Sequence, residues 1–184
     1  MKVDKVILGI DPGTVIMGYG VIHIEGKNVK VLTIGVIKLD KLNDHPTRLK
    51  KIFDRTVEII REYHPDHLAI EAPFFGKNVQ SMLKLGRAQG VAIAAALSQD
   101  VPISEYSPKK IKQSITGNGN ASKEQVSGML ENLLNTKMDD LPLDATDGLA
   151  AAMCHYFNSS GVSSSSKSYS GWASFLKENP DRKA

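Results

Sequence analysis

The sequence lacks several features on which whole classes of protein depend. It has one cysteine, Cys154, in 184 residues, which excludes an internal disulfide and a cysteine-based zinc site. No apolar stretch is long enough to span a bilayer, and the first residues lead into a strand pattern without a secretory segment. We therefore expect a soluble, cytoplasmic protein. Neither sign of charge dominates, because the formal net charge is only +3, and this mild excess is compatible with a nucleic-acid partner without demonstrating one.

The composition indicates one globular domain followed by a polar tail. A chain of 184 residues with 41% hydrophobic residues can bury one sizeable core, and we expect this domain to span residues 1–157. Residues 158–184 begin with a serine-rich run that favours a flexible linker. Beyond it, Trp172, Phe175 and Leu176 share the spacing of one helix face. They are either exposed residues of a disordered terminus or a docking peptide.

The order of apolar patterns predicts an α/β fold with a mixed sheet. Three strands are expected first, followed by alternating helices and strands, so that helices cover both faces of the sheet. The expected strands are residues 6–11, 18–24, 29–37, 67–71 and 101–105. The expected helices open at Asp44, Val79, Pro108, Ser122 and Pro142 and end near residues 63, 99, 117, 135 and 157.

Two of these helices carry specific signals. Leu49, Ile52, Phe53, Val57 and Ile60 form an apolar stripe at helical spacing after Asp44. Farther along the chain, Ser122 and Gln125 have the spacing of a capping box, which predicts a helix start at this point. Cys154 falls within the last helix, where we expect a small core residue rather than a nucleophile.

Four acidic residues mark the candidate site. Asp11 and Glu71 each end a short apolar run, which places them at the carboxyl ends of buried strands, where open α/β sheets carry their sites. Asp144 and Asp147 lie three residues apart and therefore on one helix face. Acids that converge repel one another unless a hard divalent cation lies among them. The pattern predicts Mg²⁺ or Mn²⁺, with room for two ions about 3.5–4 Å apart, and metal-assisted phosphoryl chemistry.

Each acid also has an ordinary structural explanation. Asp11 precedes Pro12 and Gly13 and is a typical turn residue after a strand. Asp144 and Asp147 suit the N-cap and N3 positions of a helix. Glu71 is harder to explain in this way, because a carboxylate that ends an apolar strand is costly to bury without a partner.

The motifs together resemble the RuvC family of Holliday-junction resolvases. The similarity is carried by residues 7–14, which end in Asp11-Pro12-Gly13-Thr14, and by residues 18–22, 69–71, 83–86, 90–93 and 144–147. This resemblance implies an RNase H-like fold, a homodimer and Mg²⁺-dependent paired nicking of four-way junction DNA that leaves 5′-phosphate and 3′-hydroxyl ends. It places all four acids at catalytic positions and suggests the RuvA–RuvB branch-migration complex as a partner.

The resemblance also suggests roles for basic and aromatic residues. Lys112 and Lys123 match basic positions near the scissile phosphate, where an ammonium offsets developing charge. Phe74 matches an aromatic that stacks on bases near the crossover, whereas we expect Phe75 to pack. The candidates for phosphate contact are Lys77, Lys84, Arg87, Lys109 and Lys110, although for the last two a solvated helix face is an equal alternative.

Gly86, Gly90 and Ala94 recur every four residues on the apolar helix. Small residues on one stripe allow a close approach either to the sheet or to the same helix of a second copy. A two-fold dimer would present two identical sites to a nearly two-fold-symmetric substrate. We therefore predict dimerisation through this helix.

Three other functions are compatible with parts of the pattern. An actin-like ATPase also has a phosphate-binding turn like residues 11–14, but it needs two such lobes. A related RNase H-like nuclease would act on RNA or on other branched DNA. A non-catalytic junction-binding protein would have no need for four acids.

Overall fold

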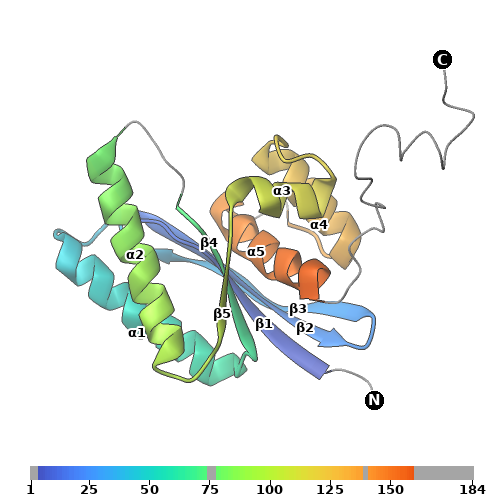
Figure 1. Cartoon of the computed structure of the whole chain (residues 1–184), viewed down its shortest axis with the longest axis horizontal. Coiled ribbons are helices and arrows are strands. Elements are labelled where there is room, and N and C mark those ends of the chain that lie inside the picture. Colours follow the sequence, from blue (N-terminus) through green and yellow to red (C-terminus); the bar gives the residue numbers. More distant parts are fainter. Residues whose placement is uncertain (1–3, 74–77, 139–140, 160–184) are drawn as a thin grey trace, which may run out of the picture.

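The computed structural model describes residues 4–73, 78–138 and 141–159, and its centre is one five-stranded sheet (Figure 1). The strands are β1 (Asp4–Asp11), β2 (Ile16–Glu25), β3 (Asn28–Lys38), β4 (His67–Glu71) and β5 (Ile103–Tyr106). Their order across the sheet is β3-β2-β1-β4-β5. The first three strands pair antiparallel, whereas β4 is parallel to β1 and β5 is parallel to β4. This arrangement confirms the predicted mixed sheet.

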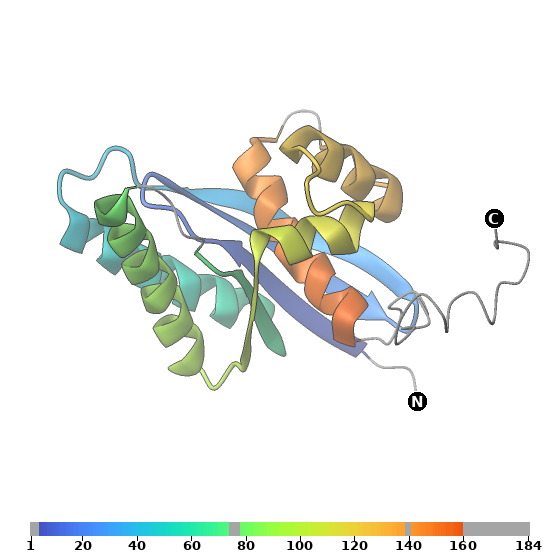
Figure 2. The same cartoon turned by 45° about the horizontal axis from the view of Figure 1, so that its top comes forward.

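Helices cover both faces of the sheet, as predicted (Figures 1 and 2). The helices are α1 (His45–Tyr63), α2 (Val79–Leu97), α3 (Pro108–Thr116), α4 (Lys123–Leu134) and α5 (Leu143–Ser159). One apolar core lies between the sheet and the pair α1 and α2, and a second lies between the sheet and α3, α4 and α5. Burial of both faces explains why β1 and β4 are continuously apolar rather than alternating.

The caps of α1 and α4 confirm the predicted helix starts. Asp44 accepts a hydrogen bond from the backbone N–H of Thr47 at 2.8 Å. Ser122 and Gln125 form both bonds of the capping box. In each case the side chain satisfies a backbone donor that has no partner within the first turn.

Some details of the prediction were wrong. Phe53 does not belong to the buried stripe of α1, because it is 37% exposed, whereas Ile59 is buried. The buried face centres on Ile52, Thr56 and Ile59, and Phe53 lies at its margin. Helix α2 ends two residues earlier than expected, because the N–H of Val101 turns back to the carbonyl of Ala96 and the chain then enters β5.

Helix α5 lies unusually close to the sheet, and glycines make this possible. A Cβ on Gly18 would fall 1.6 Å from the carbonyl oxygen of Asp144, and one on Gly148 would fall 2.5 Å from Cα of Tyr19. Gly9 and Gly20 make similar approaches to α5. The backbones of α5, β1 and β2 are therefore in direct contact, and this contact sets the height of α5 above the strand ends.

Three further points concern individual predictions. Cys154 is fully buried, which confirms the predicted core position. Within the described residues, no helix combines the length and apolar character needed to cross a membrane. Residues 160–184, with Trp172, Phe175 and Leu176, lie outside the described residues, as do Phe74, Phe75 and Lys77.

Candidate metal centre

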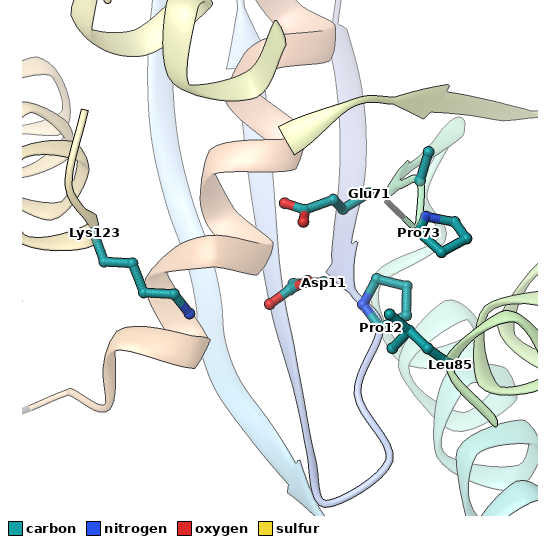
Figure 3. A pocket seen from close by; sticks show the side chains of 7 residues that line it. Asp11, Pro12, Glu71, Pro73, Leu85 and Lys123 are labelled. Carbon is teal, nitrogen blue, oxygen red and sulfur yellow. The ribbon is translucent and has the colours of Figure 1, made fainter. Parts of the chain in front are cut away.

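Two of the predicted acids lie side by side at one edge of the sheet. Strands β1 and β4 are parallel neighbours in which Ile10 pairs with Ile70, so Asp11 and Glu71 follow at adjacent strand ends. Both acids line one pocket of about 230 Å³ (Figure 3). Its other lining residues are Pro12, Ala72, Pro73, Leu85 and Lys123. The figure shows Lys123 entering from the side opposite Leu85.

Helix α5 brings the other two acids to the same place. Oxygen atoms of Asp11, Asp144 and Asp147 all lie within 4.8 Å of one another, a spacing compatible with one shared cation. Glu71 is not a member of this group of three, but it lies in the same pocket and its charge acts on Asp11. The helix begins at Leu143, so Asp144 lies in the first turn and is not the N-cap residue.

The electrostatics of this cluster show a lack of positive charge. Burial, followed by the charges of Glu71 and Asp147, raises the pKa of Asp11 from 3.8 to about 8. Burial and then the charge of Asp147 raise the pKa of Glu71 from 4.5 to about 7. Burial also raises the pKa of Asp147. A cluster of partly desolvated carboxylates is stabilised by a bound cation, and oxygen ligands suit a hard divalent ion. The donor set therefore fits a divalent metal.

Two lysines face these acids, but they differ in their contacts. Lys123 Nζ donates to Asp147 Oδ2 and, at 3.5 Å, to Asp144 Oδ1. Burial lowers the pKa of Lys123, but its hydrogen bond to Asp147 and the nearby acids outweigh burial and raise it overall. Lys112 is half-buried on α3, and its charge lowers the pKa of Glu71 and of Asp147.

The other predicted basic residues lie away from the acids. Lys109 and Lys112 line a second pocket at the start of α3, together with Ser107, Pro108 and Gly119. Lys110 is exposed on the same helix. Lys84 and Arg87 are exposed on α2, where their charges lower the pKa of His45 after the larger effect of burial.

Sequence reasoning missed two contributors to the site. Gln89 is 7% exposed on α2 and donates to Glu105 Oε2 at 2.7 Å and to the carbonyl of Glu71 at 3.4 Å. It therefore ties α2 to the strand that carries Glu71. A lone amide in an otherwise apolar helix was the available signal. The second contributor is the glycine contact beneath α5, which isolated glycines in strand patterns suggest.

The fold and the acids together define an RNase H-like nuclease: a mixed five-stranded sheet with carboxylates at adjacent strand ends and on a facing helix. The family model described as "Crossover junction endodeoxyribonuclease RuvC" matches residues 7–155. The chain therefore belongs to the RuvC family, as the motifs predict. This assignment decides against the actin-like ATPase.

Curated relatives agree over nearly the whole chain. The RuvC of Christiangramia forsetii is 60% identical over 182 residues, which cover 99% of this chain and 94% of the relative. The RuvC of Porphyromonas gingivalis is 56% identical over 183 residues and covers 97% of each chain. Both carry the name crossover junction endodeoxyribonuclease.

Solved structures agree on the fold. The RuvC of Thermus thermophilus in complex with a Holliday junction substrate is 32% identical, with a TM-score of 0.78, over 84% of this chain and 94% of that chain. The yeast mitochondrial Holliday junction resolvase is 15% identical, with a TM-score of 0.56, over 80% of this chain and 76% of that chain. The yeast enzyme supports the RNase H-like fold alone.

Proposed function

We propose that this protein is a Holliday-junction resolvase that hydrolyses symmetry-related phosphodiesters of four-way junction DNA and leaves 5′-phosphate and 3′-hydroxyl ends. The observation that carries the proposal is the convergence of Asp11, Asp144 and Asp147 within 4.8 Å, in a chain that belongs to the RuvC family. The nuclease domain would comprise residues 1–157, with residues 158–184 as an appended tail. Like the DNA on which it acts, the protein would be cytoplasmic.

The four acids would hold the metal. Asp11, Glu71, Asp144 and Asp147 supply oxygen ligands for Mg²⁺ or Mn²⁺, and their number suits two ions. When bound, the metal supplies an activated water and stabilises the leaving 3′ oxygen. The desolvated setting that raises the pKa of Asp11 also strengthens the attraction between these carboxylates and a cation.

The basic residues would position the DNA. Lys112 and Lys123 lie close enough to the acids to offset charge on the scissile phosphate. Lys77, Lys84, Arg87, Lys109 and Lys110 would contact phosphates farther along the arms, and Phe74 would stack on a base near the crossover.

A homodimer would match the symmetry of the junction. Gly90 and Ala94 are exposed, Gly86 is half-buried, and Cβ atoms on the two glycines would meet no described residue within 4 Å. The stripe therefore does not pack on the sheet, which removes the alternative explanation for it. Leu97 extends the same face and is 55% exposed. We infer that this face of α2 meets its counterpart in a second copy, and that RuvA–RuvB is the partner complex at the junction.

The test is cleavage of a mobile four-way junction in the presence of Mg²⁺, with both strands mapped at nucleotide resolution. We expect paired nicks at symmetric positions. Duplex DNA, other branched DNA and RNA–DNA hybrids run in parallel, and preferential cleavage of any of these would identify a different RNase H-like nuclease.

The Asp11→Asn variant tests the role of the acids. It should bind the junction with near-wild-type affinity but lose at least about a hundredfold in cleavage rate, since it removes a metal ligand without removing any DNA contact proposed here. Binding is measured by gel shift in Ca²⁺ and cleavage in Mg²⁺. Full activity of this variant would refute the assignment of the site.

A further inference from the structure

The ammonium group of Lys123 lies among the carboxylates that would hold the metal. Lys123 Nζ contacts Asp147 Oδ2 and Asp144 Oδ1, the latter at 3.5 Å. Both acids belong to the group that converges within 4.8 Å. The ammonium and a divalent cation would therefore be attracted to the same carboxylates.

The backbone that carries Lys123 is held firmly, while its side chain remains accessible. Lys123 is the first residue of α4 and directly follows Ser122, whose capping box closes with bonds of 2.9 and 3.2 Å to Gln125. The Lys123 side chain is 47% exposed, whereas that of its partner Asp147 is 14% exposed. Rotation about the side-chain bonds can carry the ammonium toward solvent or a phosphate without any movement of the helix.

Lys112 provides the contrast. It comes from α3 and acts by charge on Glu71 and Asp147. In the described part of the chain it has no hydrogen bond to any of the four acids. The two lysines thus have similar electrostatic neighbours, but only one of them is engaged with the carboxylates themselves.

We propose that Lys123 is a resident counter-ion that competes with the metal for Asp144 and Asp147 in the DNA-free protein. A DNA phosphate at the site draws the ammonium away and frees the two carboxylates. Metal binding and DNA binding then favour each other, and by linkage each raises the affinity for the other by the same factor. The inference rests on the proposed metal-dependent cleavage and adds an order to it, because the metal site becomes complete only beside a phosphate.

The first experiment measures Mn²⁺ binding to the full-length protein without DNA, by the electron paramagnetic resonance signal of free Mn²⁺. We expect Lys123→Gln to bind Mn²⁺ about tenfold more tightly than wild type. Lys123→Arg, which keeps the positive charge, should stay within about threefold of wild type, as should Lys112→Gln. These factors correspond to the coupling of about 5–150-fold that is typical between interacting sites.

The second experiment adds a four-way junction in which a methylene group replaces the bridging 3′ oxygen at the crossover phosphates. This junction keeps the phosphate charge but resists hydrolysis. We expect it to tighten Mn²⁺ binding about tenfold more in wild type than in Lys123→Gln, because the variant has no ammonium to withdraw.

The outcomes separate this inference from the proposed function. Equal tightening by Lys123→Gln and Lys112→Gln would reduce the effect to general charge and overturn the inference. No tightening in Lys123→Gln would overturn it as well, while leaving metal-dependent cleavage intact. Absence of Mn²⁺ binding in every protein, with and without the junction, would instead defeat the proposed metal centre and the inference with it.

Discussion

At the scale of the residue, Asp11 shows how burial and like charge act together. Its apolar strand places it in a largely desolvated position, and Glu71, Asp147 and Asp144 add negative charge around it. Each unit of pKa shift corresponds to about 1.4 kcal/mol of differential interaction between the two protonation states. The metal-free site is therefore a strained arrangement that a divalent cation relieves.

This strain predicts a pH dependence of stability in the metal-free protein. The folded pKa of Asp11 is raised from 3.8 to about 8, so its contribution to stability is fully present below pH 3.8 and is lost as the pH rises to about 8. Asp11→Asn removes this loss and should raise the free energy of unfolding at pH 8 by about 2 kcal/mol. Urea unfolding from pH 4 to 8 in EDTA measures the difference. A gap that does not widen with pH would contradict the explanation.

A pair of histidines at the other end of the sheet predicts the opposite trend. His67 and His155 stack with their ring centroids 4.0 Å apart, and His155 Nδ1 bonds to the hydroxyl of Tyr106 at 2.8 Å. Burial, followed by the charges of His67 and Lys5, lowers the pKa of His155 to about 4. Its contribution to stability is therefore present above pH 6.5 and is lost as the pH falls toward 4.

Unfolding of His155→Gln tests this trend. Between pH 7 and 4.5 the variant should lose about 1 kcal/mol less stability than wild type, a value reduced for the partial exposure of the ring. The comparison is made by chemical denaturation at a series of pH values. Parallel pH curves for the two proteins would show that His155 does not titrate with unfolding.

At the scale of the element, the position of α5 decides whether the four acids form a site. Periodicity predicts that Asp144 and Asp147 share a helix face, but it does not determine how near that face comes to β1. The contacts of Gly18 and Gly148 across α5 and β2 determine this distance. The structural role of these glycines is therefore also a functional one.

Two glycine-to-alanine changes in helices separate this packing role from helix propensity. Gly148→Ala should destabilise the protein by about 3 kcal/mol and reduce cleavage, because the new Cβ must displace α5 and with it Asp147. Gly128→Ala in α4 should stabilise the protein by up to about 1 kcal/mol, since its Cβ would meet no described residue within 4 Å. Thermal unfolding and junction cleavage measure both effects. Similar results for the two variants would mean that the close approach of α5 is unimportant.

At the scale of the whole molecule, the exposed face of α2 calls for a covering surface. Gln89 on this helix bonds to the carbonyl of Glu71, so contacts made by α2 with a second copy would also act on the strand that ends at the site. A dimer would thus bring two metal centres into a fixed relation, which paired nicking of one junction requires.

Dimerisation can be tested with two matched leucines. Leu97 on α2 and Leu133 on α4 are 55% and 47% exposed. Leu97→Glu should weaken the dimer at least tenfold, since it places an unpaired charge in the proposed interface, whereas Leu133→Glu should leave it unchanged. Sedimentation velocity over a range of micromolar concentrations measures the effect. A wild-type protein that sediments only as a monomer would exclude the dimer.

The local sequence alone determined the elements of this protein and the identity of the acidic residues. Apolar runs, caps and turn residues act over a few positions, so the strands ending at Asp11 and Glu71 and the capped start of α4 could be predicted from neighbours in the chain. Phe53 was placed wrongly because the width of a buried face depends on what packs against it.

Only the tertiary structure decided the distances between groups that lie far apart in the sequence. The approach of α5 to the sheet, the contact of Lys123 with Asp144 and Asp147, and the exposure of the α2 stripe each depend on how separate elements pack. Packing responds to the shape and charge of the whole neighbourhood, and no short window of sequence contains that information.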